Sequence, residues 1–457
     1  KLKMVILPLW NYKYLFLNKA IKVTGNNPIF YNITFKVISD GVWIENLTIF
    51  NNRAERNNAW GILVYNVTST TILNCTIDVY DPNAAYAIYV LESSGVDIIN
   101  NTLSSEGNYL TYTILANSVF DCNIINNVIF TNGTGQVHIF EKEHCLEGDS
   151  VCTDGSSVCT DGSSVCTDGN SVCTDGNANP GSHVLKEVYR TYGILMVYSS
   201  DNVVSKNRVT VTSKLNKTHS PNNSTNSLVG IDLYYDSHNN VFSENNVYVY
   251  GNDNYLYGMG VLGYYTTMND PEGRGAVNNQ FINNVIRVEG SYCAEGIIIG
   301  SSTRLTLIDG NQVNASSTNV TYGITLEMSQ NLDIKNNNLT LNSMVIYGIE
   351  AFDSNNNKIN NNKFDIDAEQ GFGFVISNGN YNEIKSNKLF LDLYGDGTIT
   401  NISTKHYDII GSGYAGIYLR AYSSNNSIID NNITISKEYA IIIDEEAVSN
   451  NISDNYL

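Results

Sequence analysis

Basic residues are scarce in this chain and nowhere gather into a cluster. Lysine and arginine together number 26 among 457 residues, against 45 aspartates and glutamates, so the formal charge at pH 7 is −19. Proteins that bind nucleic acid use clustered lysine and arginine side chains to contact phosphates. The sequence therefore predicts no nucleic-acid partner, and its acidity is expected mainly to keep a long surface soluble.

Long apolar runs are also missing. The first ten residues, KLKMVILPLW, contain too short an apolar stretch for a signal peptide or a membrane span, and no other segment is long enough to cross a bilayer. Charged residues make up 16% of the chain and hydrophobic residues 42%. This balance predicts a hydrophobic core and excludes a wholly disordered chain.

Histidine is rare, and the six histidines show no paired spacing that would indicate a metal site. His138, His144 and His183 flank a cysteine-rich block, but its cysteines lie seven residues apart. Zinc sites commonly begin with two ligands separated by two residues. The sequence therefore predicts no cofactor, with Ca²⁺ at acidic side chains as the alternative.

What the chain does contain is a repeat of two marks that runs from about residue 46 to the end. The first mark is a Gly-Ile-like pair, found at Gly61-Ile62, Ala87-Ile88, Gly193-Ile194, Gly230-Ile231, Gly260-Val261, Gly296-Ile297, Gly323-Ile324, Gly348-Ile349, Gly373-Phe374, Gly416-Ile417 and Ala440-Ile441. The second mark is an asparagine about fourteen residues later, found at Asn74, Asn101, Asn127, Asn207, Asn246, Asn284, Asn311, Asn337, Asn361, Asn387, Asn431 and Asn455. The shortest steps between equivalent marks cluster near 25 residues.

Apolar and polar residues alternate between the marks, as in NLDIKN at 331–336, which is typical of short strands bounded by turns. A step near 25 residues fits three strands and three turns, which is one rung of a right-handed parallel β-helix. The sequence predicts an all-β solenoid of roughly thirteen rungs, about 60 Å long. The asparagine column is predicted to be structural, because Asn tolerates the left-handed conformation at turns and stacked amides can form hydrogen bonds along the axis.

The repeat divides the chain into four segments. Residues 1–31 match it poorly and are predicted to include the N-terminal cap. Residues 32–141 and 185–457 carry the rungs, and the second of these segments is expected to continue in a longer protein. Residues 142–184 interrupt the repeat. Smaller loops are expected where steps are long, at 214–227, 266–275 and 394–407.

The interrupting segment is a near-perfect heptad repeat in which each of four cysteines precedes Thr-Asp-Gly. Seven residues cannot complete a rung and Asp-Gly favours turns, so the segment is predicted to leave the solenoid as an insertion loop. Its disulfide candidates are Cys145, Cys152, Cys159, Cys166 and Cys173. Their odd number leaves one for a distant or intermolecular partner, with Cys75, Cys122 and Cys293 elsewhere in the chain. A stacked Ca²⁺ array is the alternative, through Asp154, Asp161, Asp168 and Asp175.

Two groups of residues are candidates for a functional site. Asp365, Asp367 and Glu369 alternate along one strand, so their carboxylates face one side and could hold Ca²⁺ or act as an acid and base pair. A strand that merely faces solvent has the same pattern. The second group consists of tyrosines, whose rings can stack on sugars or on a partner protein, or can pack between rungs. These are Tyr234, Tyr235, Tyr255, Tyr257, Tyr264 and Tyr265.

Asn-x-Ser/Thr acceptors for N-glycosylation are dense, including those at Asn66, Asn74 and Asn100, and favour a secreted or cell-surface protein. An Asn-, Ser- and Thr-rich strand protein also forms such tripeptides by chance. The glycosylation candidates are Asn132, Asn216, Asn223, Asn314, Asn319 and Asn401.

These marks, together with KAIKVTGNN at 19–27 and FKVISDGVWIENLTI at 35–49, resemble the adhesin-like surface proteins of methanogenic archaea, which carry parallel β-helix repeats of the pectate-lyase-like superfamily. The resemblance covers nearly everything except the cysteine block. It implies a non-catalytic, extracellular or cell-surface adhesin segment that binds glycans or surface proteins. The motifs specify fold far better than activity.

Two other functions fit the same fold. One is a polysaccharide lyase or hydrolase, with Asp365, Asp367 and Glu369 as the place to look. Against it, the chain lacks the Gly-His-Gly and Asn-Thr-Asp motifs that polygalacturonase-like families carry. The other is a filament or stalk subunit whose copies associate end to end, because a solenoid end exposes unpaired strand edges.

Overall fold

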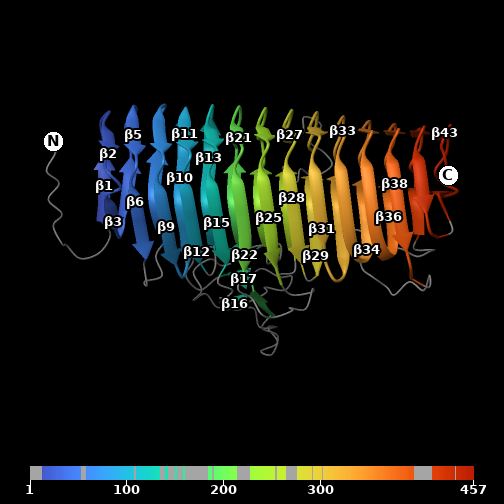
Figure 1. The fold of residues 1–457 in the computed structure, drawn as a ribbon, viewed down its shortest axis with the longest axis horizontal. Coiled ribbons are helices and arrows are strands. Elements are labelled where there is room, and N and C mark those ends of the chain that lie inside the picture. Colours follow the sequence, from blue (N-terminus) through green and yellow to red (C-terminus); the bar gives the residue numbers. More distant parts are fainter. Residues whose placement is uncertain are drawn as a thin grey trace.

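Short alternating segments of the chain form strands that pair in parallel with the equivalent strand one rung further along. The result is a right-handed parallel β-helix, drawn as a rod with its rungs side by side in Figure 1. The computed structural model describes residues 13–52, 58–107, 110–133, 190–213, 227–252, 255–263, 275–290, 292–300, 302–395, 414–437 and 439–457, and the backbone of 139–142, 150–151, 158–159 and 184–187. The all-β solenoid predicted from the repeat is confirmed.

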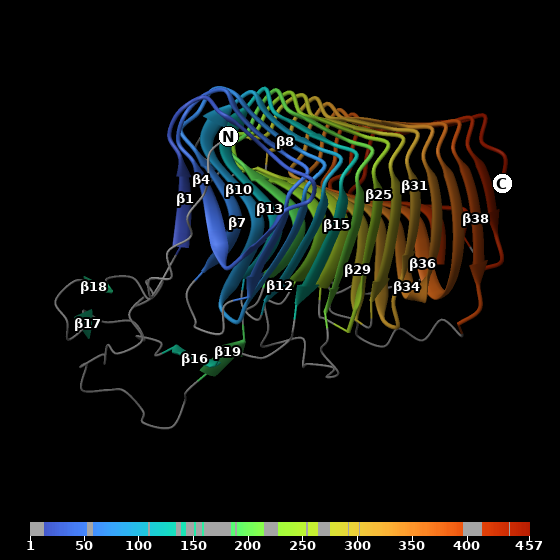
Figure 2. The same ribbon diagram turned by 60° about the vertical axis from the view of Figure 1, so that its left-hand side comes forward.

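Each described rung contributes to three columns of strands that run along the rod (Figure 2), except that the last rung adds no strand to column 3. Column 1 contains β1 (Lys13–Leu17), β4 (Ile33–Val37), β7 (Ala59–Tyr65), β10 (Ala84–Ser94), β13 (Leu110–Phe120), β20 (Arg190–Val197), β23 (Ser227–Tyr234), β26 (Tyr255–Leu262), β29 (Cys293–Gly300), β32 (Val320–Glu327), β34 (Asn338–Phe352), β36 (Lys363–Ser377), β39 (Tyr414–Arg420) and β42 (Ile441–Ile443).

Column 2 is a separate 14-stranded sheet. It contains β2 (Lys22–Thr24), β5 (Val42–Glu45), β8 (Thr70–Leu73), β11 (Val96–Ile99), β14 (Asn123–Ile125), β21 (Val203–Ser205), β24 (Val241–Ser243), β27 (Gln280–Ile282), β30 (Leu307–Asp309), β33 (Asp333–Lys335), β35 (Lys358–Asn360), β37 (Glu383–Lys385), β40 (Ser427–Ile429) and β43 (Asn451–Ser453). Its fourteen strands compare with the roughly thirteen rungs expected from the sequence.

Column 3 joins column 1 in a 25-stranded sheet, because the long strands β34 and β36 belong to both columns. Its other members are β3 (Ile29–Tyr31), β6 (Thr48–Asn52), β9 (Thr76–Asp81), β12 (Thr102–Gly107), β15 (Val128–Gly133), β22 (Arg208–Ser213), β25 (Asn246–Gly251), β28 (Val285–Gly290), β31 (Gln312–Ser316), β38 (Lys388–Leu393) and β41 (Asn432–Ile435).

The first rung begins earlier than the sequence predicted. Strands β1, β2 and β3 pair in parallel with β4, β5 and β6, so residues 13–31 form a rung and not a cap. The repeat marks are absent from this rung, which is why its pattern was missed. Residues 1–12 lie outside the described part of the chain.

At the cysteine-rich segment, the rungs on either side pair directly with one another. Strand β13 pairs with β20 and β15 pairs with β22, in the register that the other rungs use. Between them, β16 (Ile139–Lys142) pairs antiparallel with β19 (Val184–Glu187), and β17 (Ser150–Val151) pairs antiparallel with β18 (Val158–Cys159). Neither of these pairs belongs to the two large sheets.

The second mark combines two structural roles in adjacent residues. The first residue of the pair adopts a left-handed turn conformation, as at Asn100 (φ 56°) and Asn126 (φ 58°). The second residue is buried, and its amide continues a ladder along the rod. Asn207, for example, accepts hydrogen bonds from the backbone N–H of Asn127 (2.9 Å) and from its Nδ2 (3.0 Å), and donates to the Ile124 carbonyl (2.7 Å) and to Asn245 Oδ1 (3.0 Å).

At three rungs, the asparagine chosen from the sequence lies one residue away from the residue that occupies the ladder. Cys75, Asn245 and Asn362 occupy it, whereas Asn74 and Asn361 are turn residues with positive φ and Asn246 begins strand β25. A shorter second ladder lies at the opposite ends of the column-2 strands, just before each strand begins. It is formed by Asn202, Asn240 and Asn279 and then by Asn357, Asn382, Asn426 and Asn450.

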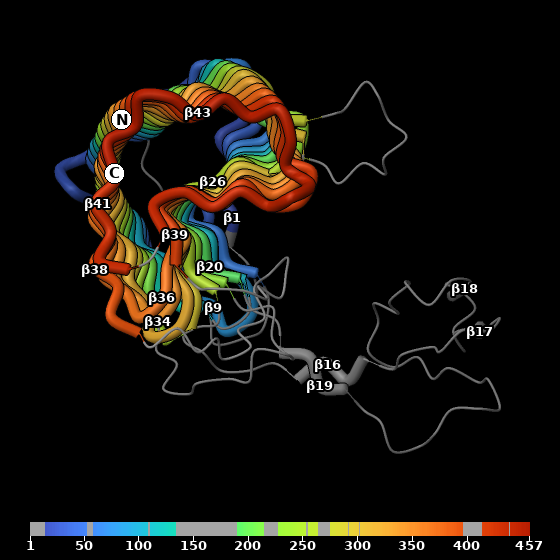
Figure 3. Tube along the Cα trace, turned by 90° about the vertical axis from the view of Figure 1, so that its right-hand side faces the viewer, coloured from blue at the N-terminus to red at the C-terminus, as the bar shows by residue number. Residues whose placement is uncertain are grey.

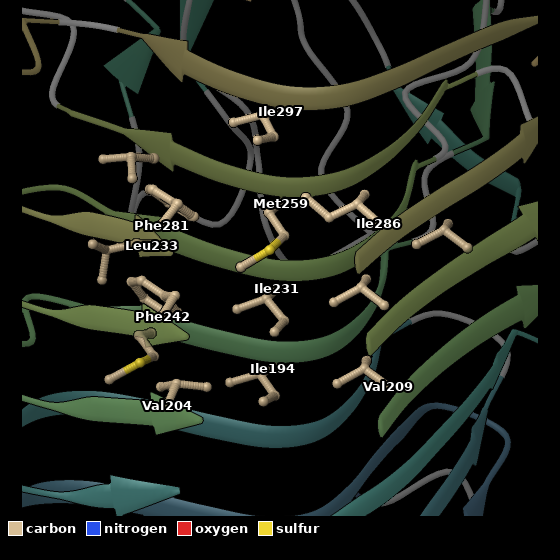
Figure 4. Close-up of a cluster of buried hydrophobic side chains, with 14 of the residues drawn as sticks. Ile194, Val204, Val209, Ile231, Leu233, Phe242, Met259, Phe281, Ile286 and Ile297 are labelled. Atoms are coloured by element: carbon tan, nitrogen blue, oxygen red, sulfur yellow. The ribbon is translucent and has the colours of Figure 1, made fainter. Parts of the chain in front are cut away.

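The lumen of the coil is filled by one continuous hydrophobic core, part of which is shown in Figure 4. Equivalent residues stack from rung to rung, such as Ile194, Ile231 and Met259. Phe242 and Phe281 stack with ring centroids 5.1 Å apart. The glycine of the first mark faces this core: a Cβ on Gly230 would lie 2.2 Å from Val247 Cγ1 and 2.4 Å from the Gly258 carbonyl oxygen.

That glycine column also corrects one mark. Strand pairing places Ile231 opposite Met259, so the equivalent pair is Gly258-Met259 and not Gly260-Val261. Gly260 instead lies opposite Asp232 on the outer face, where an added Cβ would approach Asp232 Oδ1 to 2.7 Å.

Seen along the rod, the outline bends inward at column 1, where β26 and β39 are labelled in Figure 3. Outward-facing column-1 side chains pack against one another there in two apolar clusters, hereafter the corner clusters. Aromatic rings stack along them, as in Tyr86–Tyr112 (5.5 Å), Tyr112–Tyr192 (5.3 Å) and Tyr322–Tyr347 (5.1 Å).

Within the described residues, no helix is long and apolar enough to span a membrane.

Candidate functional site

An open pocket of about 310 Å³ lies on the outer face of column 3, over strands β22, β25, β28 and β31. Successive residues of a strand point to opposite faces. Val209, Val247 and Ile286 therefore enter the core, while the residues before and after each of them on its strand face outward. The pocket is lined by the outward-facing residues Arg208, Thr210, Asn246, Tyr248, Val285, Arg287 and Asn314, and by the buried Val209 between the first two. Four rungs that are distant in sequence thus meet at one place, and we define these residues as the column-3 pocket.

Tyr248 and Arg287 form the centre of the pocket. They are direct neighbours in the β25–β28 register, and the Arg287 guanidinium carbon lies 5.2 Å from the centroid of the Tyr248 ring. Glu289 accepts hydrogen bonds from the Tyr248 hydroxyl (2.8 Å) and from Arg287 Nε (2.5 Å). Because of partial burial and this bond to Glu289, the pKa of Tyr248 is raised to about 12.

Arg208 forms another part of the pocket wall. It is exposed and lies in register with Asn246 and, one rung further, with Val285. Among the described residues it has no ion-pair partner, whereas Arg287 is paired with Glu289. Sequence reasoning did not identify Arg208, because nothing in the neighbouring sequence distinguishes it.

The predicted acidic strand lies on the same outer face. Asp365, Asp367 and Glu369 are all exposed in β36, as their alternation predicted. Their spacing along the strand is about 7 Å, so the carboxylates point the same way without converging. No three His, Cys, Asp or Glu side chains within the described ranges are grouped so that they could hold a metal ion. Calcium binding at this strand stays a prediction.

Four of the six tyrosine candidates lie in the described part of the chain, and all four are buried or half-buried. Tyr257 is buried, and Tyr234 and Tyr255 are partly buried against the corner clusters. Tyr235 occupies a left-handed turn (φ 61°) and stacks on Tyr198 at 4.9 Å. Tyr234, Tyr255 and Tyr257 thus pack between rungs, and Tyr235 lies on a turn. Tyr264 and Tyr265 lie outside the described residues.

The corner contains a titratable group that sequence reasoning missed. Asp232 is an outward-facing residue of β23 and is fully buried. Its carboxylate accepts hydrogen bonds from the Tyr257 hydroxyl and from the Leu233 N–H (3.0 Å). Burial raises the pKa of Asp232 to about 7, despite these hydrogen bonds. The only sequence signal was a single Asp at a position where the two adjacent rungs carry Leu195 and Gly260, and the next rung carries Ile298.

The described cysteines outside the heptad block are Cys75, Cys122 and Cys293, which are buried and form no disulfide. Cys75 and Cys122 replace asparagines in the two ladders, where burial raises the pKa of each thiol to about 11. Of the disulfide candidates, only the backbone of Cys159 is described. Cys145, Cys152, Cys166 and Cys173 lie outside the described residues, as do the aspartates proposed for Ca²⁺, Asp154, Asp161, Asp168 and Asp175.

Among the glycosylation candidates, Asn132 is only 4% exposed, because it belongs to a strand packed on its neighbours, so its side chain cannot carry a glycan in the folded chain. Asn314 and Asn319 are half-buried. Asn216, Asn223 and Asn401 lie outside the described part of the chain.

Comparison with known proteins agrees with the fold. A family model described as "Right handed beta helix region" matches residues 15–103. No match was found among curated protein sequences. The likeness to archaeal surface proteins stays a prediction.

Several solved structures are similar along most of the chain. The surface adhesin PfbA of Streptococcus pneumoniae is 11% identical, with a TM-score of 0.38, over 93% of this chain and 82% of that one. The A-module of the Azotobacter vinelandii mannuronan C-5 epimerase AlgE6 is 10% identical, with a TM-score of 0.33, over 97% and 89%. A tailspike protein mutant of Escherichia coli bacteriophage HK620, in complex with a pentasaccharide, is 10% identical, with a TM-score of 0.42, over 96% and 71%.

Proposed function

We propose that this β-helix is a non-catalytic binding module of a secreted or cell-surface protein, and that it binds glycans at the column-3 pocket. The observation that carries the proposal is the Tyr248 ring in an open pocket, beside charged and amide side chains. Sugars present apolar C–H faces that stack on aromatic rings and hydroxyl groups that form hydrogen bonds with polar side chains.

The scaffold suits such a site. Each strand beneath the pocket is paired on both sides, with β25 lying between β22 and β28. A platform held in this way loses little conformational freedom when a ligand binds, and that preorganisation favours affinity.

The lining of the pocket favours binding over cleavage. Hydrolysis of a glycosidic bond ordinarily uses two carboxyl groups that flank the bond. The residues that line the pocket include no Asp or Glu, and the adjacent Glu289 is engaged by Tyr248 and Arg287. A polysaccharide lyase or hydrolase remains the alternative function, and the experiment below separates the two.

Exposure to an extracellular environment is supported by the acceptor sequences on turns. Asn66, Asn74 and Asn100 are exposed and occupy left-handed turn positions, where an attached glycan would point away from the rod. Mass analysis of the protein purified from its native source would test their occupancy.

The variant Tyr248→Ala is expected to bind glycans about tenfold more weakly than the wild type, because it removes an aromatic wall of the pocket and the ring on which Tyr250 and Arg287 pack. The measurement is binding to a glycan array, with and without Ca²⁺, followed by mass analysis of the retained sugars. The wild type should retain sugars intact.

Phe390→Ala is the matched control, because it removes an exposed ring from the same outer column five strands further along. It should bind as the wild type does. A wild-type protein that binds no glycan, or a Tyr248→Ala variant that binds normally, would refute the proposed site, and shortened or unsaturated sugars would show an enzyme instead.

Association of copies into a filament stays a prediction, which sedimentation of the native protein would test.

A further inference from the structure

The column-3 pocket is positively charged on a strongly acidic chain. Arg208 and Arg287 both line it, although the whole chain carries a formal charge of −19. The two residues lie on strands two rungs apart, about 10 Å across the sheet, and are offset by two residues along it. Two guanidinium groups thus border one cavity.

The two arginines differ in their local charge balance. Glu289 forms an ion pair with Arg287 and a charge-assisted hydrogen bond to its Nε. This carboxylate holds Arg287 beside the Tyr248 ring and offsets its charge. Arg208 is exposed and has no such partner among the described residues, and the nearby Lys206 is already close to Glu244 (3.9 Å). One positive charge at the pocket is therefore not balanced locally.

An unpaired arginine beside an aromatic ring selects for a particular chemistry. The planar guanidinium group offers several N–H donors in a fixed fork that matches a carboxylate or a sulfate group. The Tyr248 ring and the amides of Asn246 and Asn314 offer contacts that a small inorganic anion would not use.

From this arrangement we infer that the column-3 pocket takes an acidic sugar unit, one that carries a carboxylate or a sulfate ester. Arg208 pairs with the anionic group and Tyr248 contacts the ring. This inference rests on the proposed glycan-binding function and adds its substrate class.

The test is titration calorimetry of the full chain with four probes: an oligouronate, a sulfated oligosaccharide, a neutral oligosaccharide of equal length, and inorganic phosphate. The wild type should bind one of the acidic oligosaccharides at least about tenfold more tightly than the neutral one. This preference should weaken as salt is added, because the Arg208 side chain is exposed. Phosphate should bind far more weakly than the acidic sugar.

The variant Arg208→Gln should lose that preference, about tenfold or more, and should lose much less affinity for the neutral oligosaccharide, which has no anionic group for Arg208 to pair with. Arg208→Lys keeps the charge but not the fork, and should fall between the two. Lys388→Gln is the control, because it removes one positive charge from the column of Arg208, six strands away. It should behave as the wild type does.

The possible failures can be told apart. If the neutral sugar binds as tightly as the acidic ones, or if Arg208→Gln keeps the preference, the acidic-sugar inference is wrong while glycan binding stands. An equal loss in Lys388→Gln would assign the preference to overall charge and would also overturn the inference. Phosphate bound as tightly as the oligosaccharides would identify an anion site only. If no oligosaccharide binds at all, the proposed function itself fails.

Discussion

At about pH 8 the variant Asp232→Asn is expected to be more stable than the wild type, by up to about 4 kcal/mol. The Asp232 carboxyl is fully buried in the corner, and its pKa is about 7 in the folded chain against an ordinary value of 3.8. Between these two values the folded state binds more protons than the unfolded state, so the stability of the wild type falls as pH rises. Asparagine keeps a hydrogen-bonding oxygen at this position but never ionises.

The measurement is the free energy of unfolding by denaturant at several pH values from about 4 to about 8. The difference between wild type and variant should be small at the acidic end, grow through the interval and level off above about pH 7. Asp365→Asn changes an exposed carboxylate and is the control, for which no such growth is expected. A difference that stays constant with pH would show that Asp232 does not titrate in this range.

The variant Asn245→Ala should be less stable than the wild type by about 2–4 kcal/mol. Asn245 is 1% exposed, and its Oδ1 accepts hydrogen bonds from the backbone N–H and the Nδ2 of Asn207 (both 3.0 Å). Its Nδ2 donates to the Val204 carbonyl (2.9 Å) and to Asn284 Oδ1 (3.0 Å). Alanine would leave the Asn207 N–H buried without this acceptor and would open a cavity in the ladder.

The neighbouring residue provides the control. Asn246 is exposed at the start of β25, and Asn246→Ala should change stability by no more than about 0.5 kcal/mol. Chemical denaturation of both variants gives the comparison directly. Equal losses would contradict the assignment of Asn245, and not Asn246, to the buried ladder.

The sequence predicted the rung because its two marks have direct physical causes. The glycine is needed where the strand faces the core with no room for a Cβ, and the asparagine is needed where buried backbone groups require a side-chain amide. Neither signal shows which residue has the structural role when two residues of the same type lie close together in the sequence. Asn245 and Asn246 are the same residue type, and Gly258 and Gly260 are two residues apart, so only the strand pairing separates the core-facing glycine from the one that makes room for Asp232.

The column-3 pocket could not be predicted in the same way. Its residues come from four rungs, and the steps between those rungs vary: the ladder partners Asn207 and Asn245 are 38 residues apart, whereas Asn284 and Asn311 are 27 apart. To predict that Arg208, Tyr248 and Arg287 lie side by side, one would therefore have to know the register of every rung between them. The acidic strand was easier to find because its three residues lie on one strand, but proximity along a strand did not make them converge.

The asparagine ladder crosses very different lengths of chain with the same geometry. Asn101 and Asn127 are 26 residues apart, Asn127 and Asn207 are 80 apart, and the amide hydrogen bond is 3.0 Å in both cases. For a flexible connection, the entropy of loop closure grows only with the logarithm of its length, so the longer one costs about 1 kcal/mol more. A turn of this rod can thus accept an inserted segment at a small cost in free energy. Peptides or whole domains can be grafted at such a turn, and proteins of this kind can diversify by insertion while their rungs stay in register.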